Sequence, residues 1–253
     1  MTSTAAANSW PVMASWRVVF LLMGFAALGH FNRVGIAVAG SEVFIPKLGL
    51  SESRMGWVYT TFLIVYTLGM LPGGWLIDRI GAVRALALYG VTMGTFVGLT
   101  GTLGWITTTS ASLWIGLLVI RGLGGACNAP LHPGAAHVVS DLMTDHRRAT
   151  ANGFITAGAL IGIACCFRVF GWLMDRLDWP LAFVVSGLTL AGYGWLWKLI
   201  ALKTMPAVVA APVVEANVAV PWPLLRQFNL WWIALSYAAY GYFQYLFFYW
   251  MDY

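Results

Sequence analysis

The stretch GWLIDRIG at residues 74–81 returns as GWLMDRLD at residues 171–178. Each copy ends an apolar segment that is long enough to span a bilayer, which takes about 20 residues in a helix. The apolar segments around the two copies fall into two groups of three. Because three is an odd number, the second group must have the opposite topology. The loop at the first copy of the stretch then lies on the inner side of the membrane, and the loop at the second copy lies on the outer side. The repeated stretch therefore predicts a six-helix bundle made of two inverted three-helix repeats.

The composition places the whole chain in a membrane. Of its 253 residues, 60% are hydrophobic and only 9% are charged, and the mean hydropathy is +0.78. A soluble globular protein of this size has more polar surface. We therefore expect an all-α, multi-pass integral membrane protein whose seven spans lie near residues 17–40, 55–77, 82–103, 111–140, 149–174, 181–201 and 229–253.

The basic residues indicate the orientation of the chain. Fourteen Lys and Arg against nine Asp and Glu leave a net charge of +5, which we interpret as a topology signal and not as a nucleic-acid site. With the N-terminus in the cytoplasm, eight Lys and Arg flank the inner ends of the helices and three flank the outer ends. This distribution follows the positive-inside rule, and we expect a plasma (inner) membrane protein with a cytoplasmic N-terminus.

The chain divides into four parts. We assign residues 1–16 to a cytoplasmic tail, residues 17–203 to the six-helix bundle, residues 204–226 to a linker and residues 227–253 to helix seven. The linker is rich in Ala, Val and Pro, a composition typical of a connection between halves. Helix seven would be the first helix of a truncated C-terminal half, so we expect either a fragment or a chain that requires a partner half.

Two arginines are isolated inside apolar segments. Arg33 is the one Asp, Glu, Lys or Arg among residues 18–41, and Arg121 is the one among residues 85–140. A guanidinium in hydrocarbon costs roughly 2.5 to 3.5 kcal/mol on insertion scales. Its planar fork of donors suits carboxylate or phosphate oxygens. The two arginines therefore predict a polar cavity that binds an anion.

Small residues at every fourth position predict close helix packing, because they let helix backbones approach each other. This spacing occurs in three places: Gly69 with Gly73, Gly158 with Gly162, and the series Gly90, Gly94 and Gly98.

The loop that begins at residue 74 resembles the signature loop between helices two and three of the major facilitator superfamily. The matching residues are Gly74, Asp78, Arg79, Gly81 and Arg84. The resemblance implies a transporter fold in which acidic and basic residues at helix ends pair with each other and with the neighbouring half. We expect these five residues to form a gate on the inner side.

Further stretches resemble the anion:cation symporter family of that superfamily, which carries organic anions such as sugar acids, carboxylates and phosphorylated compounds. They include NRVGIAVA at residues 32–39 and RGLGG at residues 121–125. The likeness covers helices one to six and reaches the seventh. It implies that Arg33 and Arg121 hold the substrate anion and that Tyr66 contributes a hydroxyl group.

Two positions depart from the pattern of that family. Many proton-coupled members carry an acid just before the first arginine and a glutamate seven residues after the second, where this chain has Asn32 and Asn128. An amide cannot take up a transported proton, but it can hydrogen-bond substrate oxygens or tie helices together. The coupling stays open between exchange, facilitated diffusion, sodium coupling and a proton carried by His30 or His132, which are otherwise packing residues.

The leading hypothesis is a secondary transporter that moves a small organic anion by alternating access. The alternative is a membrane sensor or scaffold that binds an anion without moving it. We expect neither an enzyme nor a cofactor or metal, because the sequence pairs no nucleophile with a base and contains no metal cluster or phosphate loop. The expected partners are the small anionic substrate, the lipid bilayer and the missing C-terminal half.

Overall fold

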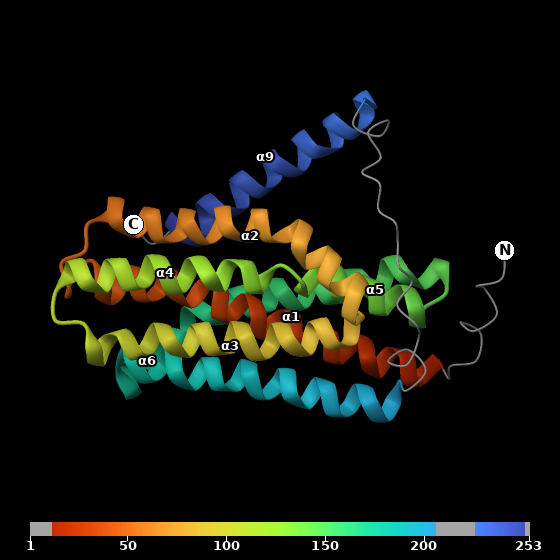
Figure 1. Ribbon diagram of the computed structural model, residues 1–253, viewed down its shortest axis with the longest axis horizontal. Coiled ribbons are helices and arrows are strands. Elements are labelled where there is room, and N and C mark those ends of the chain that lie inside the picture. The colour runs from red at the N-terminus through yellow and green to blue at the C-terminus, as the bar shows by residue number, and fades with distance from the viewer. Residues whose placement is uncertain (1–11, 206–225, 251–253) are drawn as a thin grey trace.

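The computed structural model describes residues 12–205 and 226–250, and every regular element in these ranges is a helix (Figure 1). The prediction of an all-α protein is confirmed. Most of the predicted N-terminal tail and linker, and residues 251–253, lie outside the described residues, so the division into four parts stays a prediction. The elements are α1 (Val12–Ala39) with a π-helical extension η1 (Gly40–Phe44), α2 (Glu52–Ile80), α3 (Ala82–Ile106), α4 (Ser110–Asn128), α5 (Leu131–Leu142), α6 (Asp145–Thr204) and α9 (Phe228–Trp250).

Several of these helices have the length and hydropathy of membrane spans. Within the described ranges there are five such stretches, and α9 is not among them, so a seventh span stays a prediction. The last of the five contains two of the predicted spans. The stretches are Met13–Phe44, Glu52–Ile80, Ala82–Ile106, Ser110–Leu142 and Asp145–Thr204.

The longest helix, α6, contains two membrane-length segments. It has 60 residues, which at 1.5 Å per residue would reach about 90 Å, three times the hydrocarbon thickness of about 30 Å. The helical backbone is broken at Asp178, where φ is 62° and ψ is 158°. We call residues 145–177 the first segment of α6 and residues 179–204 its second segment. The prediction of a loop between helices five and six is therefore wrong, because the single residue Asp178 makes the turn.

This turn repeats the geometry of the turn between α2 and α3. Gly81, which ends α2 and precedes α3, has φ 84° and ψ 149°. Gly81 and Asp178 occupy the eighth position of the two copies of the repeated stretch. Positive φ is the conformation that Gly adopts without steric cost. The repeat in sequence is thus also a repeat in backbone conformation.

The predicted fourth span is not one helix but two. α4 and α5 are separated at Ala129 and Pro130. Proline has no backbone N–H, so the α-helical hydrogen bond from residue 130 to residue 126 cannot form. The N–H of Ala129 donates instead to the carbonyl oxygen of Ala126, at 3.4 Å. The two short helices together still have the length of a membrane span.

The helices pair as an inverted repeat requires. α1 packs against the first segment of α6, α2 against α4, and α3 against the second segment of α6. A two-fold axis between the repeats exchanges helices one and four, two and five, and three and six. It converts the first of these contacts into the second and leaves the third unchanged. The predicted inverted repeats are confirmed by this pairing.

Glycines permit the closest of these approaches. A Cβ atom at Gly162 in the first segment of α6 would collide with the carbonyl oxygen of Ala27 in α1. A Cβ at Gly90 in α3 would lie 2.6 Å from the Cα of Gly194 in the second segment. Any larger side chain would force the helices apart, so the spacing of small residues correctly predicted close packing.

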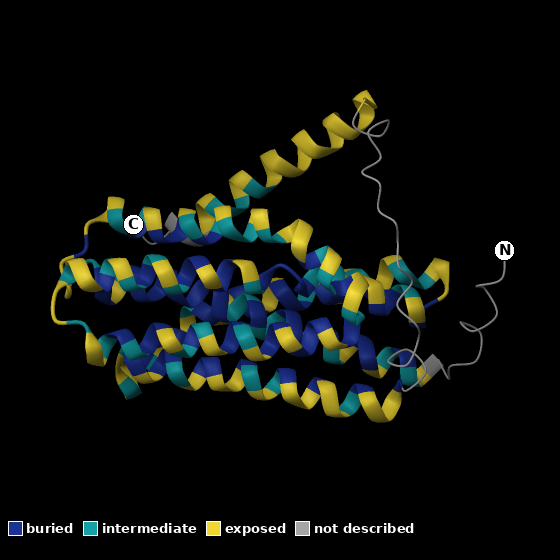
Figure 2. Cartoon of the chain, viewed as in Figure 1, coloured by how far each residue is buried: buried dark blue, intermediate teal, exposed yellow. Residues whose placement is uncertain are grey.

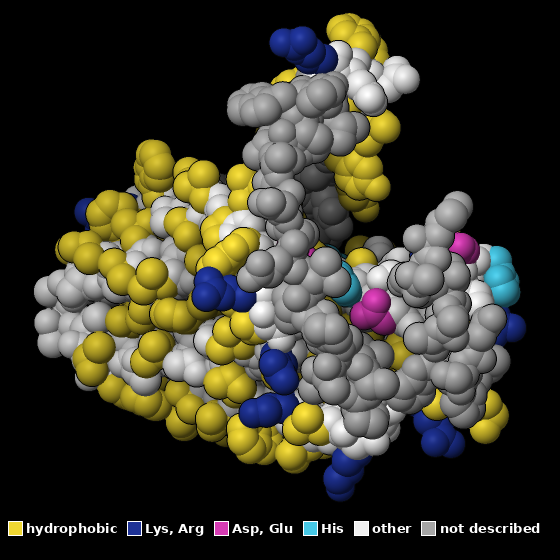
Figure 3. Space-filling model, turned by 45° about the vertical axis from the view of Figure 1, so that its right-hand side comes forward, with side chains coloured by type: hydrophobic (Ala, Val, Ile, Leu, Met, Phe, Trp, Pro, Cys, Tyr) yellow, Lys and Arg dark blue, Asp and Glu magenta, His cyan; other side chains and the backbone are white. Residues whose placement is uncertain are grey.

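The exterior of the bundle is apolar along its length and charged at one end. Figure 2 shows buried residues between the helices and exposed residues on their outer faces. The end at which α1 starts, α2 turns into α3 and α6 ends is turned forward in Figure 3, where Lys, Arg, Asp and His side chains gather beside a mostly hydrophobic flank. This arrangement suits a bilayer around the flank and water at the end.

Candidate anion-binding site

The two isolated arginines lie together inside the bundle. Arg33 in α1 is 4% exposed and Arg121 in α4 is 3% exposed. The Nη2 atom of Arg121 donates a hydrogen bond of 2.9 Å to the backbone carbonyl oxygen of Arg33. Each arginine comes from the first helix of its repeat, so the symmetry of the fold brings them to one place.

An aromatic wall from α2 contacts both guanidinium groups. The centroid of the Phe62 ring is 5.2 Å from Cζ of Arg33 and 4.9 Å from Cζ of Arg121. The Tyr66 ring is 4.9 Å from Cζ of Arg33. A cation over an aromatic face gains about 0.5 to 2 kcal/mol, most where water is excluded. The ring of Tyr66 thus belongs to the site, and the predicted contact of its hydroxyl group with substrate stays a prediction.

A tyrosine from α9 completes the surroundings of Arg33. Nη2 of Arg33 donates a hydrogen bond of 2.6 Å to the hydroxyl oxygen of Tyr245, whose ring centroid is 4.9 Å from Cζ of Arg33. Sequence reasoning did not single out Tyr245, because helix seven is crowded with aromatic residues and only the fold decides which one meets the arginine.

Three buried polar atoms near these arginines accept no hydrogen bond from the described residues. They are Oδ1 of Asn32, Oδ1 of Asn128 and the hydroxyl group of Tyr89. The amide nitrogen of Asn32 donates to the carbonyl oxygen of Leu28, at 2.9 Å. A buried polar atom without a partner costs about 1 to 3 kcal/mol, so such atoms are expected where a ligand or water binds. Asn32 and Asn128 were predicted as site residues, whereas Tyr89 was missed within an apolar helix.

The two histidines predicted as separate proton carriers are neighbours. His30 in α1 and His132 in α5 have Nε2 atoms 3.5 Å apart, and their ring centroids are 5.1 Å apart in an edge-to-face arrangement. Nδ1 of His30 lies 3.1 Å from the carbonyl oxygen of Ala26. The structure therefore joins two side chains that the sequence offered as alternatives.

Carboxylates are absent from the described interior. Every Asp and Glu in residues 12–205 and 226–250 is exposed, and the buried charged side chains in these ranges are Arg33 and Arg121. The described part of the site is therefore cationic, and it suits an anionic ligand.

The predicted gate residues lie at the charged end of the bundle. Asp78, Arg79 and Arg84 are exposed, and Cζ of Arg79 is 4.9 Å from the ring of Trp75. Gly81 makes the turn, and a Cβ at Gly74 would have open space around it. Within the described ranges, no salt bridge includes the carboxylate of Asp78. The pairing of the gate with a second half stays a prediction.

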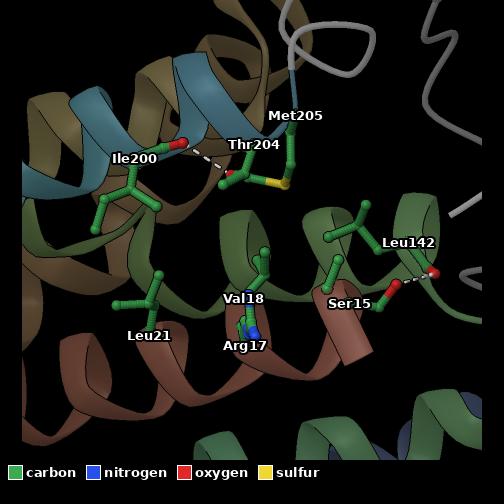
Figure 4. A pocket seen from close by; sticks show the side chains of 9 residues that line it. Ser15, Arg17, Val18, Leu21, Leu142, Ile200, Thr204 and Met205 are labelled. Atoms are coloured by element: carbon green, nitrogen blue, oxygen red, sulfur yellow. Dashed lines mark hydrogen bonds between the residues drawn. The ribbon is translucent and has the colours of Figure 1, made fainter. Parts of the chain in front are cut away.

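A small pocket at the same end is distinct from the arginine site (Figure 4). It lies between the start of α1 and the end of α6, and its lining is mostly apolar. Its hydroxyl groups are satisfied locally, since Ser15 donates to the carbonyl oxygen of Leu142 at 3.4 Å and Thr204 to that of Ile200 at 2.8 Å. Arg17 is the charged residue of its lining, and it is exposed, unlike the buried arginines of the anion site.

Two curated relatives match about three quarters of this chain. The chain is 32% identical over 190 residues to the probable galactarate/D-glucarate transporter GudP of Bacillus subtilis, an alignment that covers 75% of this chain and 40% of the relative. It is 30% identical over 192 residues to a D-galactonate transporter of Escherichia coli, with 74% of this chain and 41% of the relative covered. The aligned region is thus less than half the length of either relative.

The fold has a counterpart among solved structures. A crystal structure of the peptide transporter POT in complex with alafosfalin matches 88% of this chain and 46% of its own chain with a TM-score of 0.61 at 17% identity. The family model of the Major Facilitator Superfamily matches residues 22–253, which include the repeats, the arginine pair and the gate loop. The chain therefore belongs to the major facilitator superfamily.

Proposed function

We propose that this chain contains the N-terminal half and helix seven of a secondary transporter that moves a sugar-acid anion across the plasma membrane by alternating access. A second six-helix bundle, of which α9 is the first helix, would supply the opposite wall of the site. In this proposal the N-terminus and the gate loop are cytoplasmic, because the basic loops lie at that end. The names of the relatives, which are transporters of galactarate, glucarate and galactonate, support the substrate class.

The observation that carries the proposal is the buried pair Arg33 and Arg121. Arg33 lies inside the membrane-length stretch Met13–Phe44, and Arg121 lies inside the stretch Ser110–Leu142. At about 1.5 Å per residue, both arginines are roughly 15 Å or more from either end of their stretches. A guanidinium pair at this depth suits a carboxylate that crosses the membrane, because a substrate at the midplane can be reached from both sides.

The other polar atoms suit the rest of a sugar acid. A polyhydroxy acid carries hydroxyl donors along its chain, and Oδ1 of Asn32, Oδ1 of Asn128 and the hydroxyl of Tyr89 offer acceptors. We assign the carboxylate to Arg33 and Arg121 and the hydroxyl groups to these acceptors. An anion without hydroxyl groups would leave the acceptors unsatisfied, at a cost that favours sugar acids over simple carboxylates.

The gate and α9 would provide the moving parts. The hydroxyl group of Tyr245 accepts a hydrogen bond from Arg33, in a position that a carboxylate oxygen of the substrate can take. If a substrate oxygen replaced the Tyr245 hydroxyl group as the partner of Arg33, the packing of the two halves around Arg33 would change. Asp78, Arg79 and Arg84 would then close or open the cytoplasmic side through pairs with the second half.

Flux measurements test the proposal. We expect proteoliposomes that contain the complete transporter to exchange radiolabelled galactonate for unlabelled galactonate, and galactonate, glucarate and galactarate to raise the thermal unfolding temperature of the purified protein. A non-transporting sensor with the same fold would show the thermal shift without the flux. If no sugar acid gives either flux or a rise in the unfolding temperature, the proposed substrate class is refuted.

A further inference from the structure

His30 and His132 form a pair of neighbouring imidazole side chains, and His30 lies one helical turn before Arg33 of the anion site. Their Nε2 atoms are 3.5 Å apart, and both side chains are partly buried. His30 precedes Arg33 by three residues, which places them on one face of α1. The guanidinium group of Arg33 is close enough to act electrostatically on both imidazole rings.

The hydrogen bonds of the pair define where an added proton goes. The carbonyl oxygen of Ala26 only accepts, so Nδ1 of His30 carries a hydrogen. In neutral His30 the lone pair is then on Nε2, and Nε2 of His132 must supply the hydrogen between the rings. Nδ1 of His132 is the remaining basic nitrogen. One added proton therefore binds there, and the pair carries a single positive charge.

Among the described interior side chains, the two histidines are the ones best suited to bind and release a proton near neutral pH. None of the described acids is buried, and the Tyr, Cys and Arg side chains around the site ordinarily titrate well above neutral pH. Imidazole is the one side chain here whose ordinary titration falls near neutrality. The charged and titratable side chains of the adjoining arginine site and of the helices that pack there are Arg33 from α1, Tyr66 from α2, Tyr89 from α3, Arg121 from α4, Cys166 from α6 and Tyr245 from α9.

We propose that the His30–His132 pair is the coupling site of the transporter, taking up one proton when a carboxylate binds beside Arg33 and releasing it when the carboxylate leaves. This inference rests on the proposed transport function. Next to the Arg33 cation a second positive charge is unfavourable, and a bound carboxylate offsets that repulsion. Because coupling between two sites is reciprocal, the proton strengthens anion binding as much as the anion strengthens proton binding. The proton enters from water on the side open to substrate and leaves to water on the other side.

A pH gradient across proteoliposomes tests the coupling in the complete transporter. With one proton per monovalent galactonate, an inside-alkaline gradient of about one pH unit should drive about tenfold accumulation, since one pH unit is a factor of ten in proton activity. In the variant with His30→Gln and His132→Gln, we expect that accumulation to disappear and the remaining galactonate exchange to lose its dependence on pH, because glutamine keeps hydrogen-bonding capacity but cannot bind a proton. His146→Gln is the matched control, since His146 is exposed and contacts the hydroxyl of Thr144.

The outcomes separate this inference from the proposed function. Absence of galactonate exchange in the original protein would refute the proposed transport of galactonate, on which this inference rests. Exchange that ignores the pH gradient, or a double variant that still accumulates galactonate, would overturn only the histidine site. If the double variant does not fold, calorimetry on the original protein in buffers of different ionisation enthalpy decides. We expect binding of galactonate to take up as much as about one proton between about pH 6 and 8, and no proton uptake across that range would overturn the inference.

Discussion

In the first repeat α2 turns into α3 at Gly81, and in the second repeat the two segments of α6 meet at Asp178, with nearly the same φ and ψ. The backbone of this turn is thus common to both repeats, but the residue is not. Gly adopts this region without cost, whereas a residue with a Cβ atom is strained there by about 1 to 3 kcal/mol. The fold therefore depends on the turn geometry more strongly than on the residue that makes it.

The two arginines also occupy equivalent helices of the two repeats but have different surroundings. Arg33 is surrounded by the rings of Phe62, Tyr66 and Tyr245, while Arg121 meets the Phe62 ring and donates to the backbone of Arg33. Symmetric helices thus carry side chains with different contacts. Arg121 ties the second repeat to the first, and Arg33 is the arginine that meets α9.

The largest expected effect comes from Arg121→Lys. Lysine keeps the charge but loses the planar fork, so it cannot hold both oxygens of a carboxylate in bidentate geometry while it donates to the Arg33 carbonyl oxygen. We expect sugar-acid uptake to fall by about 100-fold, the equivalent of a charged hydrogen bond of about 2 to 3 kcal/mol. Arg33→Lys should impair uptake similarly but lower the thermal unfolding temperature less, because it is the Arg121 side chain that bonds α4 to the backbone of α1. Undiminished uptake in Arg121→Lys would contradict the site.

The next-largest effect compares two helix contacts that the two-fold axis between the repeats exchanges, the contact of α1 with α6 and the contact of α2 with α4. Gly162→Ala places a methyl group against the carbonyl oxygen of Ala27, whereas Gly73→Ala places one 3.0 Å from the Cβ of Ala129. Overpacking costs about 1 to 3 kcal/mol, and we expect Gly162→Ala to lie at the upper end and Gly73→Ala at the lower. Thermal unfolding of the purified variants measures both. Equal losses would indicate that the contacts of α1 with α6 and of α2 with α4 are equally tight.

A smaller effect is expected at the ring that both arginines share. Phe62→Leu keeps an apolar side chain but removes the aromatic face, so anion affinity should fall about fivefold to tenfold, or about 1 to 1.4 kcal/mol. Tyr66→Phe keeps its ring and removes only the hydroxyl group. The affinity of Tyr66→Phe, measured by calorimetry, tests the predicted hydroxyl contact, and an unchanged value would remove Tyr66 Oη from the list of substrate contacts.

The smallest effect concerns the two turns. Asp178→Gly should raise the free energy of unfolding by about 1 kcal/mol, because it relieves strain at positive φ. Gly81→Asp should lower it by a similar amount for the same reason. Asp175→Gly is the control, since residue 175 lies in a helix, where glycine destabilises. If Asp178→Gly were as destabilising as Asp175→Gly, the two turns would not be equivalent.

Much of the bundle could be predicted because its signals are local. Apolar length fixed where spans lie, and the repeated GWL stretch marked equivalent turns. The break between α4 and α5 was missed, although Pro130 and Pro133 stand inside the predicted span and proline interrupts helices. The absence of a loop in α6 could not be seen, because one residue in an unusual conformation replaces the loop that a reversal ordinarily needs.

The arginines could be predicted because a charge in an apolar segment is conspicuous by itself. Tyr89, Tyr245 and the contact between the two histidines could not, because each depends on which residues of different helices face one another. The neighbours of Tyr89 in sequence are apolar, and its unpartnered hydroxyl group becomes visible only when α3 is packed against α1.

The most direct test of the account is a structure of the complete transporter with galactonate bound. We expect the carboxylate of galactonate to lie within hydrogen-bonding distance of the guanidinium groups of both Arg33 and Arg121, with the Tyr245 hydroxyl displaced from Arg33 or shared with the ligand. A carboxylate bound elsewhere, with both arginines keeping their present contacts, would contradict the claim that this pair recognises the substrate.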